Sequence, residues 1–328
     1  MPSPLLFCLP GNEILAERLA MAVEAELGEL SIRSFPDAET YVRLKTDPQG
    51  RDVAIVCTLP DPNEKILPLL FATGAARALG ARQVGLVAPY LSYMRQDAVF
   101  HPGEAVSARI FADVLAAEAE WLITIDPHLH RIARLSDVYR IPATALHVAD
   151  VIGTWVRRHV ADPLIVGPDE ESIQWAASVA AAAHAPCVML RKERLSDTRV
   201  LVTLPDIGSH DGRTPVLVDD IISTGQTMIA ALAAMRKSLP ASRRAICLGV
   251  HALFTSRVLD AILAAGATRV VTTNTIPHFS NAIDVVAVLA SALREQWADP
   301  PGTAAPSAGD APRTNRTSFA PSVALEVK

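Results

Sequence analysis

Short apolar runs alternate along the chain with longer stretches whose apolar residues recur at helical spacing. The apolar runs predict strands over 52–59, 83–90, 120–126, 163–169, 214–220, 245–253 and 268–276. The stretches with helical spacing predict helices over 13–27, 64–79, 105–118, 171–183, 225–238, 257–265 and 281–297. Several strands are almost continuously apolar, as expected when helices cover both faces of a parallel sheet. The alternation predicts an α/β fold built from parallel βαβ units.

This pattern occurs twice. Residues 1–147 and 148–297 each hold several strands with intervening helices, and no Pro/Ser-rich linker separates them. We therefore predict two related α/β lobes packed directly together. Residues 298–328 are rich in Pro, Ala, Ser and Thr and lack apolar periodicity, which predicts a disordered tail.

Composition and charge exclude several classes of protein. Of the 328 residues, 50% are apolar and 20% are charged, so the chain can bury a sizeable core and is not globally disordered. A net charge of −5 argues against a protein that coats nucleic acid or an anionic membrane. It still allows a local basic pocket for a phosphorylated metabolite. The low aromatic content of 5% disfavours a stacking platform for single-stranded nucleic acid.

The cysteines and the N-terminal segment bear on the cellular compartment. Cys8, Cys57, Cys187 and Cys247 lie far apart and form no CxxC pair, which argues against a zinc ribbon or a redox dithiol. We expect buried free thiols in a reducing compartment. The first residues carry no basic segment and too short an apolar run for a signal peptide, and no stretch approaches the roughly 18 apolar residues that span a bilayer. We expect a soluble cytoplasmic protein that binds no membrane and no nucleic acid.

The strongest chemical signal follows the strand predicted over 214–220. That strand ends in Asp219 and Asp220, and the next residues are Ile221, Ile222, Ser223, Thr224, Gly225, Gln226 and Thr227. Two adjacent carboxylates at a buried strand end repel each other unless they bind something, and vicinal sugar hydroxyls can donate hydrogen bonds to both. Backbone N–H groups, hydroxyls and a helix N-terminus together make a phosphate cradle. For an isolated Asp pair, helix capping by Asp220 or Ser223 is the simpler interpretation, but the whole unit favours a ribose-phosphate site.

This unit resembles the phosphoribosyl pyrophosphate (PRPP) signature of type I phosphoribosyltransferase folds, and other segments narrow the resemblance to the ribose-phosphate pyrophosphokinase family. RSFPDAETYVR resembles the family's FPDGE-YVR run, and PYLSYMRQD followed by PGEAVSA resembles its PYxxYxRQD…GEx(I/V)SA run. Further similar segments are DPH at 126–128, VGPD at 166–169, RKER at 191–194, VHALFT at 250–255 and TNTIP at 273–277. The matches keep the family's order over residues 5–297. They imply two tandem type I phosphoribosyltransferase-like lobes, with the ATP-binding elements in 1–147 and the ribose 5-phosphate site in 148–297.

The resemblance implies a reaction. The β,γ-diphosphoryl group of ATP passes to the anomeric hydroxyl of ribose 5-phosphate, giving PRPP and AMP, with Mg²⁺ as cofactor. It implies Lys192 and Arg194 as catalytic residues, His128 and Asp169 near the metal, and Asp219, Asp220, Ser223, Thr224, Gly225, Gln226 and Thr227 around ribose 5-phosphate. The implied ATP-binding residues are Phe35, Asp37, Glu39, Arg95 and Gln96. In the family the loop that carries Phe35 serves a neighbouring subunit, so a homo-oligomer is implied.

Each of these residues also has a simpler interpretation. RKER by itself is consistent with a solvated charge run, and Phe35 with an ordinary strand end. His128 by itself would be a hydrogen-bonded loop histidine, because Mg²⁺ prefers oxygen ligands. His130 matches no family role.

Departures from the family pattern leave alternatives open. Glu170, Glu171 and Ser172 stand where commoner members carry glycines, Ser223 stands where many have Asp, and the loop after Asp97 has fewer basic residues than usual. These differences indicate a divergent branch. A catalytically silent regulatory paralogue and a phosphoribosyltransferase that consumes PRPP are the alternatives. The chain has no GxxxxGK[ST], GxGxxG or HExxH motif, so Walker-type kinases, Rossmann oxidoreductases and zincins lack support.

Overall fold

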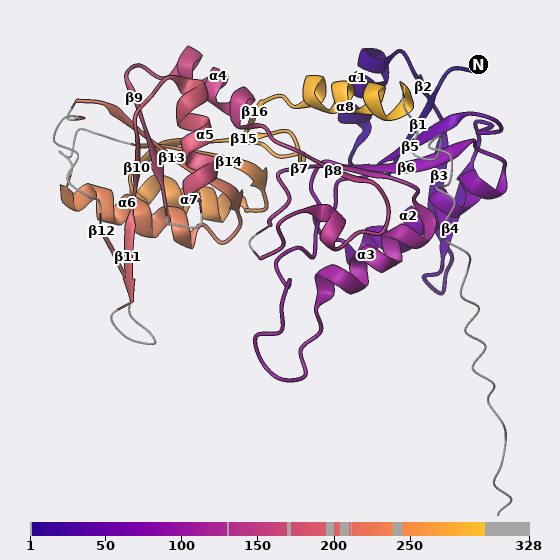
Figure 1. Cartoon of the computed structure of the whole chain (residues 1–328), viewed down its shortest axis with the longest axis horizontal. Helices are drawn as coiled ribbons and strands as arrows, with labels where there is room; N and C mark the ends of the chain where they lie inside the picture. Colours follow the sequence, from indigo (N-terminus) through magenta and orange to yellow (C-terminus); the bar gives the residue numbers. More distant parts are fainter. Residues whose placement is uncertain are drawn as a thin grey trace, which may run out of the picture.

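The fold consists of two lobes that lie side by side along the long axis of the molecule (Figure 1). The computed structural model describes residues 2–129, 131–168, 172–194, 200–203, 210, 212–238 and 245–298. Each lobe contains a six-stranded sheet in which all neighbouring strands are parallel.

The two sheets have the same strand order. The first is β2-β1-β5-β6-β7-β8, with β1 at Leu5–Cys8, β2 at Glu26–Leu27, β5 at Asp52–Val56, β6 at Gln83–Ala88, β7 at Leu122–Ile125 and β8 at Ala143–Leu146. The second is β10-β9-β13-β14-β15-β16, with β9 at Pro163–Gly167, β10 at Cys187–Met189, β13 at Thr214–Ile222, β14 at Ala245–Ala252, β15 at Ala267–Thr273 and β16 at Asn281–Ile283. The repeat predicted from the sequence is therefore present in the topology.

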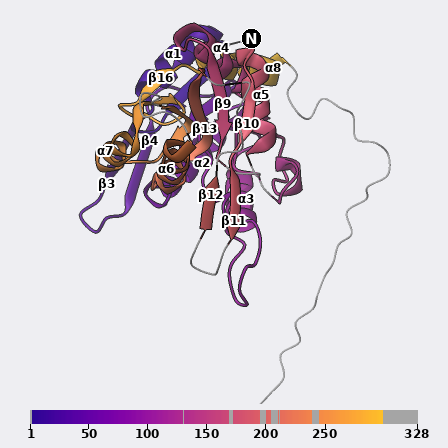
Figure 2. The same cartoon turned by 90° about the vertical axis from the view of Figure 1, so that its left-hand side faces the viewer.

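Each half also carries an antiparallel hairpin after its second sheet strand. In the first half the hairpin is β3 (Leu30–Ser34) with β4 (Thr40–Leu44), and in the second it is β11 (Arg191–Arg194) with β12 (Val200–Thr203). Figure 2 shows β11 and β12 extending away from the body of the second lobe.

Helices cover the sheets, and the helix that follows each sheet packs on the other lobe. The connecting helices are α1 (Glu13–Val23), α2 (Asn63–Ala78), α3 (Ser107–Glu118), α5 (Ile173–Ala183), α6 (Gln226–Ser238) and α7 (Ser256–Ala265), with a 3₁₀ turn at Leu135–Asp137. Helix α4 (Ala149–His159) follows the first sheet but packs against α5, whereas α8 (Val286–Ala298) follows the second sheet but packs against α1 (Figure 1). This exchange ties the lobes together.

Both crossing helices begin in the same way. The backbone N–H of Val148 donates to Asp126 Oδ2 at 3.1 Å, and that of Val285 donates to Asn274 Oδ1 at 2.9 Å. Asp126 directly follows β7 and Asn274 directly follows β15, and each of these is the fifth strand of its six-stranded sheet in chain order. Because a side-chain oxygen satisfies a donor that precedes the helix, each start is held where the chain leaves its sheet.

The apolar core crosses the boundary between the lobes. One continuous cluster contains Leu6 and Ile123 of the first sheet, Ile165 of the second, Trp155 of α4 and Leu289 of α8. Two further clusters fill the other faces of the two sheets. The lobes therefore share a core and are not joined by a linker alone.

The predicted strands and helices are present, but several boundaries differ. The helix predicted over 13–27 ends at Val23 because Glu24 is left-handed (φ 54°), and residues 26–27 form β2. The helix predicted over 281–297 begins at Val286 because residues 281–283 pair with β15. The strand predicted over 214–220 runs on to Ile222, so both aspartates lie inside it. Helix α4, both hairpins and the sheet strands β1, β2, β8, β10 and β16 were not predicted, although the buried residues of α4 recur at helical spacing.

The boundary between 147 and 148 stays a prediction, and the packing of α8 on the first sheet shows that a lobe is not one continuous half of the chain. The predicted tail lies outside the described residues except for Ala298.

All four cysteines are free, and burial raises the pKa of Cys57 and of Cys247 to about 12, whereas Cys8 and Cys187 are only half-buried. Over the described ranges, no helix is both long and apolar enough to span a membrane.

Gly85 in β6 offers a test of the first lobe's packing. A Cβ built on Gly85 would lie 1.9 Å from the ring of Trp121, which is fully buried. We expect Gly85→Ala to lower the free energy of unfolding by roughly 1–3 kcal/mol through overpacking, measured by urea denaturation. Gly74→Ala is the control because its Cβ would meet only the end of the Glu118 side chain, and alanine favours the helix. Equal stability of Gly85→Ala and the unaltered chain would contradict this account.

Candidate active site

The acidic doublet lies near the carboxyl end of β13, in the middle of the second sheet. Asp219 and Asp220 are both partly exposed, and the backbone N–H of Asp220 donates to Asp219 Oδ1 at 3.0 Å. Asp219 pairs with Gly249 of the neighbouring strand β14. The pairing of β13 with β14 continues to Ile222, whereas its pairing with β9 ends at Leu217, so the backbone of the doublet is held from the β14 side.

A tight turn connects this strand to α6. Gly225 has φ +73°, and a Cβ at this position would lie 2.7 Å from Val258 Cγ1, so only glycine fits here. The carbonyl of Gly225 accepts the N–H of Ile229 at 2.9 Å and so begins the helix. Thr224, Gln226 and Thr227 are exposed, and Ser223 is partly exposed. The N-terminus of α6 therefore offers hydroxyls and a helix dipole to an anion, as the sequence predicted.

A histidine from the first lobe reaches the acidic doublet. His128 Nδ1 lies 2.7 Å from Asp220 Oδ2, and their side chains are 22% and 28% exposed. His128 follows β7, in the short loop that begins with the left-handed Asp126 (φ 34°). The structure thus brings together a predicted metal-site residue and a predicted sugar-site residue from different sheets.

The loop of His128 is held by a second histidine to which the sequence assigned no role. His147 Nδ1 lies 2.8 Å from the buried carboxylate of Asp126, whose hydrogen bond raises the pKa of His147. His147 directly follows β8, and its place after an apolar strand is the signal that could have identified it.

The predicted ATP-binding residues fall into two groups. Phe35, Asp37 and Glu39 lie at the tip of the β3–β4 hairpin, where Phe35 is 39% exposed and Asp37 Oδ1 accepts the N–H of Glu39 at 3.3 Å. Figure 1 places this hairpin at the opposite end of the long axis from β13. The structure therefore does not bring the hairpin tip to Asp220 within one chain.

The second group follows β6 and lies between the hairpin and the doublet in sequence. Arg95 is exposed, whereas the amide of Gln96 donates to Glu104 Oε2 at 3.2 Å and to the carbonyl of Ala98 at 3.3 Å. Glu104 also accepts the backbone N–H groups of residues 100 and 101. Gln96 thus supports the fold of its own loop, and Arg95 presents its charge to solvent.

The remaining predicted residues are described only in part. Lys192 and Arg194 lie on β11, opposite Val202 and Val200 of β12, and their side chains are outside the described residues. Asp169 lies outside them, as do His130, Glu170 and Glu171. Among the residues that are described, no group of three or more His, Cys, Asp or Glu side chains is arranged to hold a metal ion.

Comparisons with known proteins match both halves of the chain. Residues 5–118 match the model of the N-terminal domain of ribose phosphate pyrophosphokinase, and residues 135–285 match that of the phosphoribosyl transferase domain. The chain is 34% identical to a ribose-phosphate pyrophosphokinase of Methanopyrus kandleri over 85% of this chain and 94% of the relative. It is 32% identical to one of Methanothermobacter thermautotrophicus, over 87% and 98%. The chain belongs to the ribose-phosphate pyrophosphokinase family.

A solved structure supports the same fold. The phosphoribosylpyrophosphate synthetase of Mycobacterium smegmatis matches with a TM-score of 0.79 and 22% identity, over 90% of this chain and 99% of that one. The family, the fold of two α/β lobes and the presence of an enzyme are thus confirmed. The roles of single residues stay predictions.

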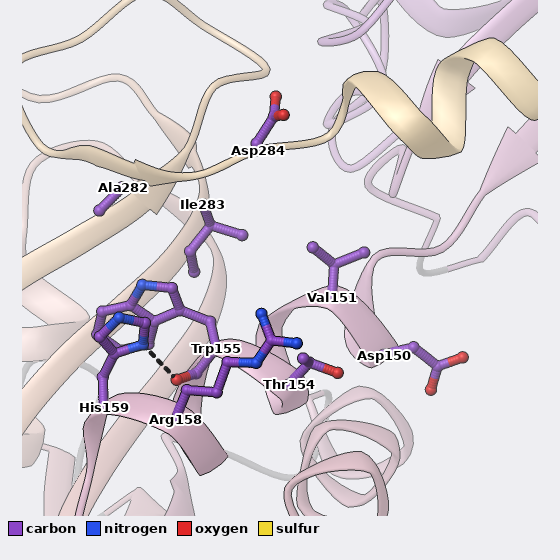
Figure 3. A pocket seen from close by; sticks show the side chains of 9 residues that line it. All are labelled: Asp150, Val151, Thr154, Trp155, Arg158, His159, Ala282, Ile283 and Asp284. Atoms are coloured by element: carbon purple, nitrogen blue, oxygen red, sulfur yellow. Dashed lines mark hydrogen bonds between the residues drawn. The ribbon is translucent and has the colours of Figure 1, made fainter.

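Two pockets in the described part of this pyrophosphokinase-family chain lie away from the predicted site residues. Among the described residues, one pocket of about 390 Å³ lies where α4 meets residues 282–284 (Figure 3). In it the ring of His159 stacks on that of Trp155, and His159 Nδ1 lies 2.8 Å from the carbonyl oxygen of Trp155. A second pocket of about 390 Å³ lies between α2 and α3. None of the predicted site residues lines either pocket, and the candidate active site is assigned from the contact of His128 with Asp220 between the lobes.

The ionisation of Asp220 depends on its neighbours. Burial by itself would raise the pKa of Asp220, but the hydrogen bond and charge of His128, together with a smaller contribution from a hydrogen bond with Asp219, hold it below its usual value. The carboxylate therefore stabilises the folded chain above about pH 4, and this contribution is lost as the pH falls through the lowered pKa.

Replacing His128 tests this balance. We expect His128→Asn to raise the pKa of Asp220, because the desolvation of the carboxylate would remain while its strongest partner would be lost. The measurement is a pH titration of the aspartate carboxyl carbons by carbon-13 NMR. His159→Asn is the matched control because His159 bonds to a backbone carbonyl rather than to a carboxylate. An unchanged Asp220 titration in His128→Asn would show that the contact does not control this carboxylate.

Proposed function

We propose that this chain transfers the β,γ-diphosphoryl group of ATP to the anomeric hydroxyl of ribose 5-phosphate, forming PRPP and AMP. A bond forms between the anomeric oxygen and the β-phosphorus, and the bond from that phosphorus to the oxygen shared with the α-phosphorus breaks. AMP leaves with that oxygen, and the hydroxyl loses its proton. The observation that carries the proposal is the contact of His128 in one lobe with Asp220 in the other, at 2.7 Å. This contact joins the two half-sites of the proposed reaction, which are the ATP-binding elements of the first lobe and the ribose 5-phosphate site of the second.

Ribose 5-phosphate fits the second lobe. Asp219 and Asp220 can accept hydrogen bonds from the vicinal ring hydroxyls. The turn from Ser223 to Gly225, with Gln226 and Thr227 at the exposed start of α6, can bind the 5-phosphate. Since the doublet and the helix N-terminus belong to one rigid strand–turn–helix unit, both ends of the sugar phosphate would be fixed together.

ATP fits the first lobe, completed by a neighbouring subunit. Arg95 lies after β6 with an exposed cationic side chain. Phe35, Asp37 and Glu39 lie at the tip of the β3–β4 hairpin, which Figure 1 shows at the opposite end of the long axis from β13. The aromatic ring of Phe35 can stack on adenine. A homo-oligomer in which this hairpin serves a partner's site would account for its exposure.

Lys192 and Arg194 are proposed to stabilise the charge that develops on the transferred group. Both lie on the second lobe's hairpin, which extends away from the body (Figure 2). An ammonium and a guanidinium can both neutralise phosphoryl oxygens, and the guanidinium does so with a bidentate geometry. The hairpin would have to bring them to the triphosphate.

The family supports a metal-dependent reaction, and we propose Mg²⁺. When bound, this ion neutralises phosphate charge. The carboxylate oxygens near the doublet suit it, because Mg²⁺ typically takes only one or two carboxylates and completes its coordination with water and substrate phosphates. A cluster of three protein ligands is therefore not required. His128 and Asp169 are the residues proposed to hold the ion or its waters.

The alternatives lack comparable support. A phosphoribosyltransferase that consumes PRPP needs one such lobe, whereas the match to the family's N-terminal domain over 5–118 accounts for the other. The chain retains Lys192, Arg194, His128 and the doublet, which speaks against a catalytically silent paralogue.

The products of the reaction test the proposed function. We expect the purified chain to release AMP from ATP only when ribose 5-phosphate and Mg²⁺ are both present. The measurement is separation of nucleotides by ion-exchange chromatography, with xylulose 5-phosphate as the control sugar. Formation of ADP, or release of a free base instead of AMP, would contradict the proposal. No AMP with any divalent metal would favour the silent paralogue.

Two substitutions separate binding from chemistry. Asp220→Asn should weaken ribose 5-phosphate binding by roughly tenfold or more, because one sugar hydroxyl loses a charged acceptor. Lys192→Ala should lower turnover by roughly 10²–10³-fold with ribose 5-phosphate binding largely unchanged. Calorimetry measures the first effect and the AMP assay the second. An unaltered dissociation constant in Asp220→Asn, or an unaltered rate in Lys192→Ala, would remove that residue from its role.

A further inference from the structure

A buried histidine of the second lobe bonds to the backbone of the first. His251 lies on β14, opposite Ile221 of β13, and is 1% exposed. Its Nε2 lies 3.1 Å from the carbonyl oxygen of Ile125 and 3.2 Å from that of Asp126. These carbonyls end β7 and begin the loop that carries His128. The second lobe thus forms hydrogen bonds with the start of the loop that carries His128 to Asp220.

The direction of these hydrogen bonds is determined by their partners. Carbonyl oxygens only accept, so Nε2 carries the hydrogen and donates it to the first lobe. Nδ1 lies 2.9 Å from Thr275 Oγ1. Burial lowers the pKa of His251 and so favours the neutral ring, in which Nδ1 accepts the Thr275 hydroxyl hydrogen. Both ring nitrogens therefore have partners, one in each lobe.

Thr275 connects to the first lobe by a second bond. The hydroxyl of Thr58 donates to the carbonyl oxygen of Thr275 at 2.6 Å. Thr58 follows β5, is 1% exposed, and has its other groups engaged, because its N–H donates to Asn12 Oδ1 and its carbonyl accepts from Lys65 Nζ. Thr275 is 0% exposed. A buried polar network thus runs from β5 through Thr275 and His251 to the end of β7.

An apolar contact reinforces this network. The ring of Tyr90, at the end of β6, packs on the ring of His251 with centroids 4.9 Å apart. The ends of β5, β6 and β7 are therefore each in contact with either residue 251 or residue 275 of the second lobe. An unpaired polar group at a buried position raises the free energy of the folded state, so the network has one favoured arrangement.

We propose that His251, with Thr58 and Thr275, is a positioning device that sets the separation of the two half-sites. It rests on the proposed function, because it assigns these residues to the alignment of the β-phosphorus with the anomeric oxygen. His251 touches neither substrate. It holds the His128 loop of one lobe at a fixed distance from the doublet of the other.

The opposing view is that His251 is a core histidine that contributes only stability. Thr272 supplies a matched control, because it is 0% exposed and its hydroxyl bonds only within the second lobe, to Ser280 Oγ at 2.7 Å and Asn281 Nδ2 at 3.0 Å. Thr272→Val thus removes a buried hydroxyl of the same kind without cutting a contact between lobes.

The experiment compares His251→Leu and Thr58→Val with that control in the full chain. We expect the two cross-lobe variants to lower the kcat for AMP formation by roughly 10–100-fold, whereas the dissociation constants of ATP and ribose 5-phosphate change little. His251→Gln retains a donor that can reach the two carbonyls, and Thr58→Ser retains the hydroxyl, so both should recover much of the rate. Thr272→Val should lose stability but keep its kcat below its unfolding temperature.

Hydrogen exchange gives a readout that does not depend on activity. His251→Leu should speed amide exchange in residues 125–129, which belong to the other lobe, and Thr272→Val should not. If His251→Leu fails to fold, Thr58→Val and Thr58→Ser carry the test. If the unaltered chain forms no AMP, the proposed function fails and the exchange data alone decide whether the network holds the loop.

Two results would overturn the proposal. The first is a wild-type kcat in folded His251→Leu and Thr58→Val, which would leave the network a purely structural role. The second is a loss confined to the dissociation constant of ribose 5-phosphate, which would place His251 in support of sugar binding rather than of alignment.

Discussion

Two half-sites on separate sheets can serve one reaction only if the sheets keep a fixed distance. The contact between His128 and Asp220 at 2.7 Å marks where they meet. It lies between partly exposed side chains, and such a pair contributes little stability by itself. The structure around it supplies the rigidity, through an apolar core that crosses the boundary and through the exchange of α4 and α8 between the lobes. The relative position of the two half-sites therefore depends on packing throughout both lobes.

The repeated topology shows how two similar halves came to differ in chemistry. In the second half the third strand, β13, carries the acidic doublet, and the turn after it is open to solvent. In the first half the third strand, β5, is followed by Thr58, whose hydrogen-bonding groups are all used inside the protein. The turn that follows this strand is thus open to solvent in the second half, whereas in the first half it is hydrogen-bonded to the neighbouring lobe. Asp126 and Asn274 hold the same place in the fold, but only Asp126 brings a charge close to the active surface.

The predicted site residues lie partly on a strand of the sheet and partly on exposed turns and loops. The doublet lies on a strand that is paired with β14 through this region, so its carboxylates are carried by the backbone of the sheet. The start of α6 and the tip of the β3–β4 hairpin are exposed and leave their polar groups to solvent or substrate. Under the proposed function, the groups on the strand would orient the sugar while the exposed segments exchange with solvent.

Local patterns in the sequence did not reveal β1, β2, β8, β10 or β16. They were enough for the other sheet strands, most helices, the duplicated order and the acidic strand–turn–helix unit, because each depends on residues close together in the chain. They missed α4, the hairpins and the extension of β13 to Ile222, whose boundaries depend on pairing and on packing against distant elements. The motif around His251 was visible, but its role was not, since its partners Ile125 and Asp126 lie more than a hundred residues away. Only the tertiary structure decided that α8 returns to the first lobe and that His128 meets Asp220. Contacts of this kind are determined by how two sheets pack, and no short stretch of sequence records that geometry.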